Sequence, residues 1–198
     1  MKFFFGFLAF IAAVVVVVLL VLGFMRTTSS NAARSLVTAT ATLTDDSMTS
    51  SVVRYTVTSP VVADENYRET RMTVSQNTRT VEVLKGYDKK VEKTSTLPNT
   101  KEAYRAFLGA LAAANFSMRR DNVQGDPRTT CVTGNHYFYE LSLGSDKKVD
   151  TWTTSCSFKN GSFAGEADST AQLFRDQFPD YDKVTSGTTQ GVYNLAPL

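Results

Sequence analysis

Histidine and cysteine are scarce in this chain of 198 residues, which contains one histidine, His136, and only Cys131 and Cys156 as cysteines. A structural zinc site takes about four nitrogen or sulfur ligands, more than these three side chains supply. A Ser-His-Asp or Cys-His arrangement would have to be built around His136, and no G-x-S-x-G turn is present. No phosphate-binding loop, dinucleotide fingerprint or H-E-x-x-H motif occurs either. We therefore expect no catalytic residue, no cofactor and no metal ligand, and we interpret His136 as a strand-edge or loop histidine.

The chain also lacks a large excess of either charge. It contains 21 basic and 19 acidic residues, and its formal net charge is +2 at pH 7. A nucleic-acid-binding domain usually carries a strongly basic face. Here the basic residues are dispersed, and the adjacent pairs predict solvated loop charge: Lys89-Lys90, Arg119-Arg120 and Lys147-Lys148. We predict that the chain has no nucleic-acid partner.

One long apolar run is present, over residues 3–25, and its only interruptions are Gly6 and Gly23. At about 1.5 Å per residue a helix of this length spans about 34 Å, enough for a hydrocarbon core of about 30 Å. A cleaved signal peptide is the alternative, but its apolar core is usually about 7–15 residues long and is followed closely by a cleavage site. The run predicts an uncleaved single-pass anchor, residues 1–26, that contacts the lipid bilayer through residues 3–25.

The orientation of this anchor is not decided by its flanking charges, since Lys2 lies on one side and Arg26 and Arg34 on the other. The segment before the anchor is only two residues long, so the folded part must follow it. That part is rich in serine and threonine and carries both cysteines, which is typical of an exported domain. We predict a single-pass protein of the cell membrane, with its N-terminus in the cytoplasm and its domain in the periplasm or extracellular.

Residues 27–51 have the composition of a linker and predict a Ser/Thr-rich stalk. Within them, threonine alternates with alanine, valine and leucine over residues 36–44, which also fits a strand. Both interpretations stay open. The exported domain is predicted over residues 52–184, and residues 185–198 form a Gly/Thr-rich tail that we expect to be extended.

The exported domain opens with side chains that alternate between apolar and polar, the pattern of half-buried strands. Val53, Tyr55 and Val57 share one face of the first strand. This strand ends at Ser59-Pro60, and the turn residues Gln76-Asn77 follow the next one. Further strands are predicted around residues 72–74, 81–83 and 91, and then at 129–132, 136–143 and 148–158.

The period changes to that of a helix over residues 100–114. Asn99 and Glu102 have the spacing of a capping box, and Asn115 is a plausible end. The apolar stripe of this predicted helix consists of Tyr104, Phe107, Leu108 and Leu111.

A second helix is predicted to begin near Ser169, with Gln172 in the capping-box position. It must end before Pro179, which has no amide hydrogen. Three strands and a helix would then occur twice, either as two duplicated βββα units or by coincidence, because this order is common in α+β proteins. The predicted fold class is therefore α+β, with an N-terminal transmembrane helix and a small exported domain in which two helices cover one face of an antiparallel sheet.

An even number of cysteines in an exported domain predicts one disulfide, between Cys131 and Cys156. It would close a loop of about 25 residues and stabilise the domain by roughly 3 kcal/mol on the chain-entropy model. A redox role is less favoured, because no C-x-x-C motif occurs.

These features favour a membrane-anchored binding or assembly module outside the cytoplasm, without evident catalytic activity and with a protein or glycan partner. One alternative is an inhibitor of exported hydrolases that presents residues 121–128, next to Cys131, as a rigid loop. A second is a carboxylate-dependent hydrolase. It would need two of the scattered carboxylates, such as Asp146 and Asp150, to meet in one cleft.

Overall fold

The structure, a computed structural model, describes residues 43, 45–120, 127, 129–157 and 160–188. By its internal packing the chain divides into residues 1–38 and residues 39–198, and every described residue belongs to the second unit. None of the helices among the described residues is long and apolar enough to cross a membrane. The predicted anchor lies outside the described residues.

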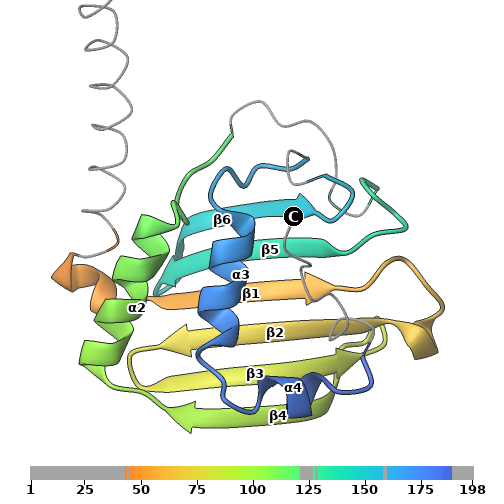
Figure 1. Cartoon of the computed structure of the whole chain (residues 1–198), viewed down its shortest axis with the longest axis horizontal. Coiled ribbons are helices and arrows are strands. Elements are labelled where there is room, and N and C mark those ends of the chain that lie inside the picture. Colours follow the sequence, from red (N-terminus) through yellow and green to blue (C-terminus); the bar gives the residue numbers. More distant parts are fainter. Residues whose placement is uncertain (1–42, 44, 121–126, 128, 158–159, 189–198) are drawn as a thin grey trace, which may run out of the picture. The chain divides into compact units, whose positions relative to one another are not determined.

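Six strands form one sheet, in the order β4-β3-β2-β1-β5-β6 (Figure 1). Every neighbouring pair in this order is antiparallel, which confirms the predicted antiparallel sheet. The strands are β1 (Val52–Thr58), β2 (Arg68–Ser75), β3 (Thr78–Lys85), β4 (Lys90–Pro98), β5 (His136–Leu143) and β6 (Asp146–Thr154). Strand β1 lies inside the sheet, between β2 and β5, although it comes first among them in the chain.

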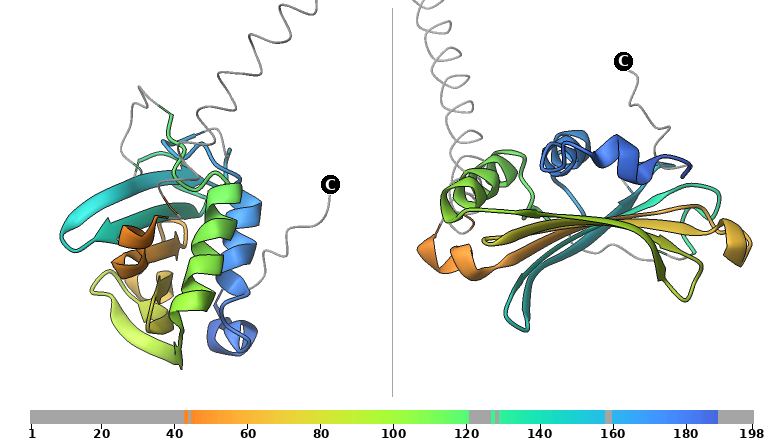
Figure 2. Two further views of the ribbon diagram at one scale, coloured as in Figure 1. Left: turned by 90° about the vertical axis from the view of Figure 1, so that its left-hand side faces the viewer. Right: turned by 90° about the horizontal axis from the view of Figure 1, so that it is seen from below.

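Three helices of the described part of the chain lie on one face of this sheet: α2 (Lys101–Ala113), α3 (Ala167–Arg175) and α4 (Tyr181–Thr185) (Figure 2). Two short 3-10 helices, η1 (Asp46–Ser50) and η2 (Asp64–Asn66), precede β1 and β2. The predicted α+β class and the placement of two helices on one face are confirmed. Helix α4 was not predicted, because five residues are too few to establish a helical period.

Both predicted capping boxes are wrong. Helix α2 is capped by Thr100, whose Oγ1 accepts a hydrogen bond from the amide of Ala103 at 3.2 Å. The side chain of Asn99 instead donates to the carbonyl of Ser75, at 2.6 Å. Helix α3 begins two residues before Ser169, and its N-cap residue makes no side-chain capping bond.

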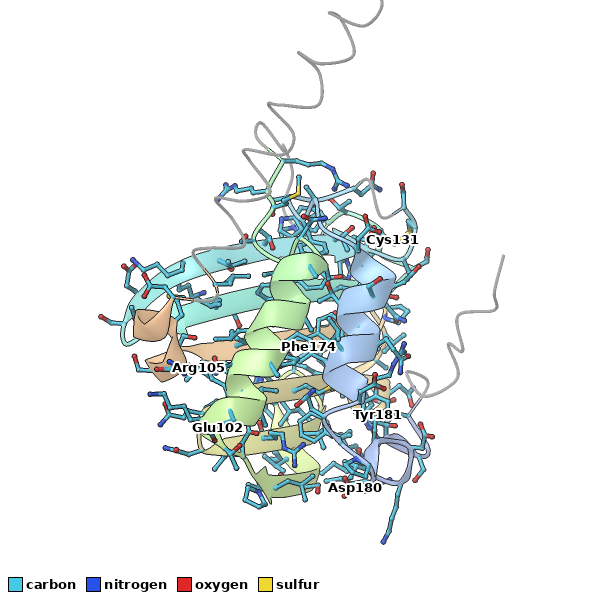
Figure 3. The ribbon with its side chains drawn as sticks, turned by 60° about the vertical axis from the view of Figure 1, so that its left-hand side comes forward. Glu102, Arg105, Cys131, Phe174, Asp180 and Tyr181 are labelled. Carbon is cyan, nitrogen blue, oxygen red and sulfur yellow. A yellow bond between two sulfur atoms is a disulfide. The ribbon has the colours of Figure 1, made fainter. Side chains whose placement is uncertain are left out.

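Aromatic rings fill the space between the sheet and the helices, and Phe174 on α3 lies at the centre of this core (Figure 3). Its ring lies 5.2 Å from Phe107 of α2 and 5.4 Å from Tyr55 of β1, measured between ring centroids. Tyr139 of β5 stacks on Phe163 at 3.7 Å. The predicted inward faces of the strands and of α2 are therefore the ones that build the core.

Residues 129–132, predicted as a strand, form a bend and turn instead. Cys131 has a positive φ of 64°, which no strand residue adopts. Among the described residues two strands, β5 and β6, precede α3. What repeats is a hairpin followed by a helix, since β3, β4 and α2 occur in the same order as β5, β6 and α3.

The turn at Cys131 and the turn at Cys156 are joined by a disulfide, with their Cα atoms 5.8 Å apart. The structure thus makes the pairing that the two cysteines predict. The bond ties the loop before β5 to the turn after β6.

The segment that the sequence assigns to the stalk reaches into the domain. Leu43 is 1% exposed and Met48 of η1 is 4% exposed, and both belong to the hydrophobic core. The remainder of that segment, the tail from residue 189 and most of the loop 121–128 lie outside the described residues.

Candidate functional site

The face of the sheet opposite α2 and α3, called the open face here, carries no helix longer than a 3-10 turn among the described residues (Figure 2). In the right-hand view the β3–β4 and β5–β6 hairpins curl away from the helices. Such curling follows from the twist of β-sheets and makes the open face concave. The strands that meet at its centre are β2, β1 and β5.

A hollow of about 800 Å³ lies on this open face. Its floor contains Thr56 and Thr58 of β1, and Phe138 stands opposite Thr56 on β5. Charged side chains surround this floor. The hollow is lined by Arg54, Thr56, Thr58, Ser59, Val61, Tyr67, Glu69, Arg71, Tyr87, Lys89, Pro127, His136, Phe138, Glu140, Lys147 and Asp150.

One wall is built where the β1–β2 connection meets the tip of the β3–β4 hairpin. Tyr67 and Tyr87 stack there with ring centroids 4.3 Å apart. The amide of Tyr87 donates to Asp64 Oδ1 at 2.6 Å, and its hydroxyl donates to the carbonyl of Val62 at 2.8 Å. Gly86, with a φ of 73°, permits the tight turn that brings these groups together. The wall is thus fixed by hydrogen bonds as well as by packing.

Tyr67 keeps its proton over the whole physiological range. Burial first, and then the neighbouring Glu69 carboxylate, raise the pKa of Tyr67 to about 12. Its hydroxyl is therefore a neutral hydrogen-bonding group on the wall of the hollow.

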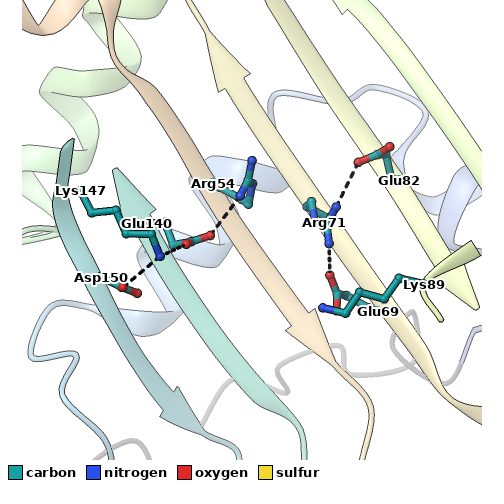
Figure 4. A network of polar contacts seen from close by, with 8 residues as sticks. All are labelled: Arg54, Glu69, Arg71, Glu82, Lys89, Glu140, Lys147 and Asp150. Atoms are coloured by element: carbon teal, nitrogen blue, oxygen red, sulfur yellow. Dashed lines mark hydrogen bonds and ion pairs between the residues drawn. The ribbon is translucent and has the colours of Figure 1, made fainter. Parts of the chain in front are cut away.

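The first of two ion-pair clusters on the open face is centred on Glu69 of β2, only 2% exposed (Figure 4). Arg71 Nη2 donates to its Oε1 at 2.6 Å, and Lys89 Nζ lies 2.9 Å from its Oε2. Both oxygens of this carboxylate are thus occupied. Arg71 also faces Glu82 on β3, but at 3.9 Å, which is too far for a hydrogen bond.

The second cluster runs across β1, β5 and β6 (Figure 4). Lys147 Nζ lies 2.9 Å from Glu140 Oε1 and 3.0 Å from Asp150 Oδ2. Arg54 Nη1 reaches the other oxygen of Glu140 at a longer distance, 3.4 Å. The strand register brings these charged side chains together, because Glu140 stands opposite both Arg54 on β1 and Asp150 on β6.

Glu140 stays ionised at neutral pH. Partial burial raises the pKa of its carboxyl, but the hydrogen bond and charge of Lys147, together with Arg54, outweigh burial and hold the pKa below its ordinary value. The same bonds, from Glu140 first and then from Asp150, raise the pKa of Lys147. A carboxyl group that serves as a general acid needs a raised pKa, so Glu140 is suited to holding cations rather than donating protons.

His136 opens β5 at the end of the hollow and is 4% exposed. Its Nε2 lies 2.6 Å from the carbonyl of Thr130, so Nε2 carries the hydrogen. Its Nδ1 then accepts from the hydroxyl of Thr58 on β1, at 3.5 Å. The ring therefore fastens the loop before β5 to the sheet, and both of its nitrogens have partners.

The structure brings together residues that the sequence did not single out. Arg54, Glu69, Arg71 and Glu140 are absent from the predicted candidates, and Lys89 and Lys147 were interpreted as solvated loop charge although both are ion-paired. The sequence does contain a signal for these residues, namely the polar side chains that alternate with the apolar ones along each strand. In Arg54-x-Thr56-x-Thr58 and Glu69-x-Arg71 this polar face alternates as regularly as the apolar one.

No protein-family model matches the chain, and no curated protein matches it in sequence. The function is therefore argued from the hollow and its chemistry.

Proposed function

We propose that this chain is a membrane-anchored binding module outside the cytoplasm, and that its ligand occupies the hollow on the open face. The observation that carries the proposal is the hollow itself, about 800 Å³ in volume and built on the central strands of the sheet. Sites for small molecules usually enclose about 300–1,000 Å³ and combine apolar surface with a few fixed polar groups.

The lining of the hollow fits binding better than it fits hydrolysis. Glu69 has a cation on each of its oxygens, and so does Glu140. Asp150 is paired with Lys147. A hydrolase that uses two carboxylates needs one of them free to exchange a proton. Phe138, Val61 and Tyr87 add the apolar contact surface that a ligand requires.

Two independent features support the proposed location. The apolar run over residues 3–25 has the length and composition of a membrane anchor. The Cys131–Cys156 disulfide is the kind of bond that persists in oxidising compartments and is rare in the cytosol.

The test blocks the hollow in the full chain, purified in detergent micelles. Thr56→Trp places an indole on the floor, while Thr80→Trp adds the same ring to the open face of β3, outside the lining of the hollow. Ligand-observed NMR against a library of small metabolites and short peptides should identify binders of the unmodified chain and of Thr80→Trp. Those binders should be lost from Thr56→Trp.

Thermal unfolding of both variants shows whether each is folded. If Thr56→Trp is folded and keeps every binder, the hollow is not the binding site and the proposal is wrong. A complete lack of binders to the unmodified chain would also count against it.

A further inference from the structure

Arginine N–H groups are the largest set of unused hydrogen-bonding groups in the hollow. Arg54 and Arg71 have five N–H donors each. Among the described residues, the side chain of Arg54 makes one hydrogen bond, to Glu140, and that of Arg71 makes one, to Glu69. By contrast, both oxygens of Glu69 and both oxygens of Glu140 are occupied. A ligand that matches this lining therefore brings acceptors.

Arg54 is the less tightly bonded of the two arginines. Its Nη1 makes the single long contact of 3.4 Å to Glu140. Its Nε is buried and has no hydrogen-bond partner in the described part of the chain. A buried donor without a partner destabilises the structure, so a ligand that draws this edge of the guanidinium toward itself and bonds to it would remove that cost. The Nε and Nη2 groups form the planar fork that holds a carboxylate with two parallel bonds.

Arg71 lies on the neighbouring strand, β2. It is opposite Thr56 in the β1–β2 register, whereas Arg54 is opposite Thr73, so the two arginines occupy diagonal positions on neighbouring strands. Side chains as long as arginine reach one another from such positions. The side chain of Arg71 is 27% exposed and that of Arg54 is 42% exposed, and both residues line the hollow.

The charge of the lining limits the charge of the ligand. Arg54, Arg71, Lys89 and Lys147 provide four positive charges, and Glu69, Glu140 and Asp150 provide three negative ones. The lining with a neutral His136 is thus one positive charge in excess, which a monoanion neutralises. Phe138, opposite Thr56 on the floor, offers an apolar surface next to the two arginines.

From these observations we infer that the hollow binds the carboxylate of a monoanionic ligand with an apolar body, held by Arg54 and Arg71 and packed on Phe138. This inference rests on the proposed function and names the ligand chemistry for the same site. A free organic acid and the C-terminal carboxylate of a peptide both have this chemistry.

The test is isothermal titration of the full chain in detergent with matched probes. Benzoate and hexanoate carry the carboxylate, while benzamide and hexanamide have the same bodies without the charge. An N-acetylated tripeptide ending in phenylalanine, with a free or an amidated C-terminus, distinguishes a peptide source from a free acid. The acids should bind at least about tenfold more tightly than the amides, because a charge-assisted bidentate pair is lost in the amides.

The variants assign the contact to its residues. Arg54→Gln should weaken acid binding about tenfold or more and leave amide binding unchanged. Arg54→Lys keeps the charge but loses the fork and should give an intermediate loss. Arg71→Gln should also weaken acid binding, although it leaves the buried Glu69 with Lys89 alone and so needs a thermal unfolding control. The matched control is Arg105→Gln on the exposed side of α2, across the sheet from the hollow (Figure 3), which should change nothing.

The outcomes separate this inference from the proposed function. If amides or inorganic phosphate bind as tightly as the acids and Thr56→Trp abolishes that binding, the hollow is a binding site but the carboxylate assignment is wrong. Acid binding that survives both Arg54→Gln and Arg71→Gln in folded protein would overturn it too. If no probe binds, the carboxylate inference fails, whereas the proposed function is still judged by the wider library and Thr56→Trp.

Discussion

At the scale of single residues, buried hydroxyls connect the helices to the rest of the domain. Tyr104 of α2 is fully buried, and its hydroxyl donates to the carbonyl of Ser51 at 2.9 Å. Burial raises the pKa of Tyr104 to about 12, although a hydrogen bond with Ser51 lowers it in part. In the unfolded chain the pKa of tyrosine is about 10. The fold therefore favours the neutral phenol, and its contribution to stability is complete below pH 10 and decreases as the pH rises toward 12.

We predict that Tyr104→Phe changes how stability depends on pH. At pH 8 the variant should be about 1 kcal/mol less stable, because the Ser51 carbonyl loses its donor. Between pH 10 and pH 11 the unmodified chain should lose about 1 kcal/mol by the ionisation linkage at Tyr104, while the variant lacks that titration. The difference in stability between the two proteins should therefore almost disappear at pH 11. Urea unfolding of both proteins at pH 8 and pH 11 would measure it. The other buried tyrosines are the same in both proteins, so their ionisation does not change the difference in stability. A difference that is equal at pH 8 and pH 11 would contradict the prediction.

At the scale of secondary-structure elements, the approach of α3 to the end of α2 is set by a glycine. A Cβ atom at Gly165, just before α3, would come closer than 3.0 Å to the carbonyl oxygens of Asn115 and Ala114 and to the ring of Phe163. Two of these neighbours are backbone atoms at the C-terminal end of α2, which cannot move without displacing the helix. Glu166 also donates its amide to the Ala114 carbonyl, at 2.9 Å.

We therefore predict that Gly165→Ala destabilises the domain by about 1–3 kcal/mol, the usual cost of forcing atoms into a packed site. The matched control is Gly109→Ala in the middle of α2, where an added Cβ would meet nothing within 4 Å. It should stabilise the domain by about 0.5–1 kcal/mol, since alanine is the better helix former. Urea unfolding midpoints of the two variants should shift in opposite directions, and shifts in the same direction would show that α3 can move away from α2 at little cost.

The elements also show what the sequence can predict. Strands β1, β2, β3 and β5 and the core faces of α2 and α3 follow from apolar periodicity, because burial selects these side chains one by one. The caps do not follow, since Asn99 and Thr100 are both able to cap α2, and the choice depends on the Asn99 bond to Ser75 on another strand. The hollow could not be predicted for the same reason, because it depends on contacts between residues that are distant in the chain. Arg54, Arg71 and Glu140 are 17 to 86 residues apart in the chain, and only the strand register makes them neighbours.

At the scale of the whole domain, one face of the sheet is covered by helices (Figure 2). The other face holds paired charges around a hollow. The disulfide lies at the end of the sheet where β5 begins and β6 ends, near His136. It closes a sequence separation of 25 residues, which corresponds to roughly 3 kcal/mol of stability on the chain-entropy model. If the domain is exported, this bond forms in the cell and the stability includes it.

The last prediction uses this bond to test the location of the domain. The full chain, recovered from cells in the presence of an alkylating reagent, should show no free thiol by mass spectrometry. A variant without residues 2–25 should stay in the reducing cytosol, because it lacks the predicted anchor, and should show both Cys131 and Cys156 alkylated. Its domain should be about 3 kcal/mol less stable in urea until it is oxidised, and the double variant Cys131→Ser/Cys156→Ser should have the lower stability with or without reductant.

Two alkylated cysteines in the full chain would mean that the domain faces the cytosol. The proposed binding in the hollow would then stand, but the proposed location outside the cytoplasm would be wrong.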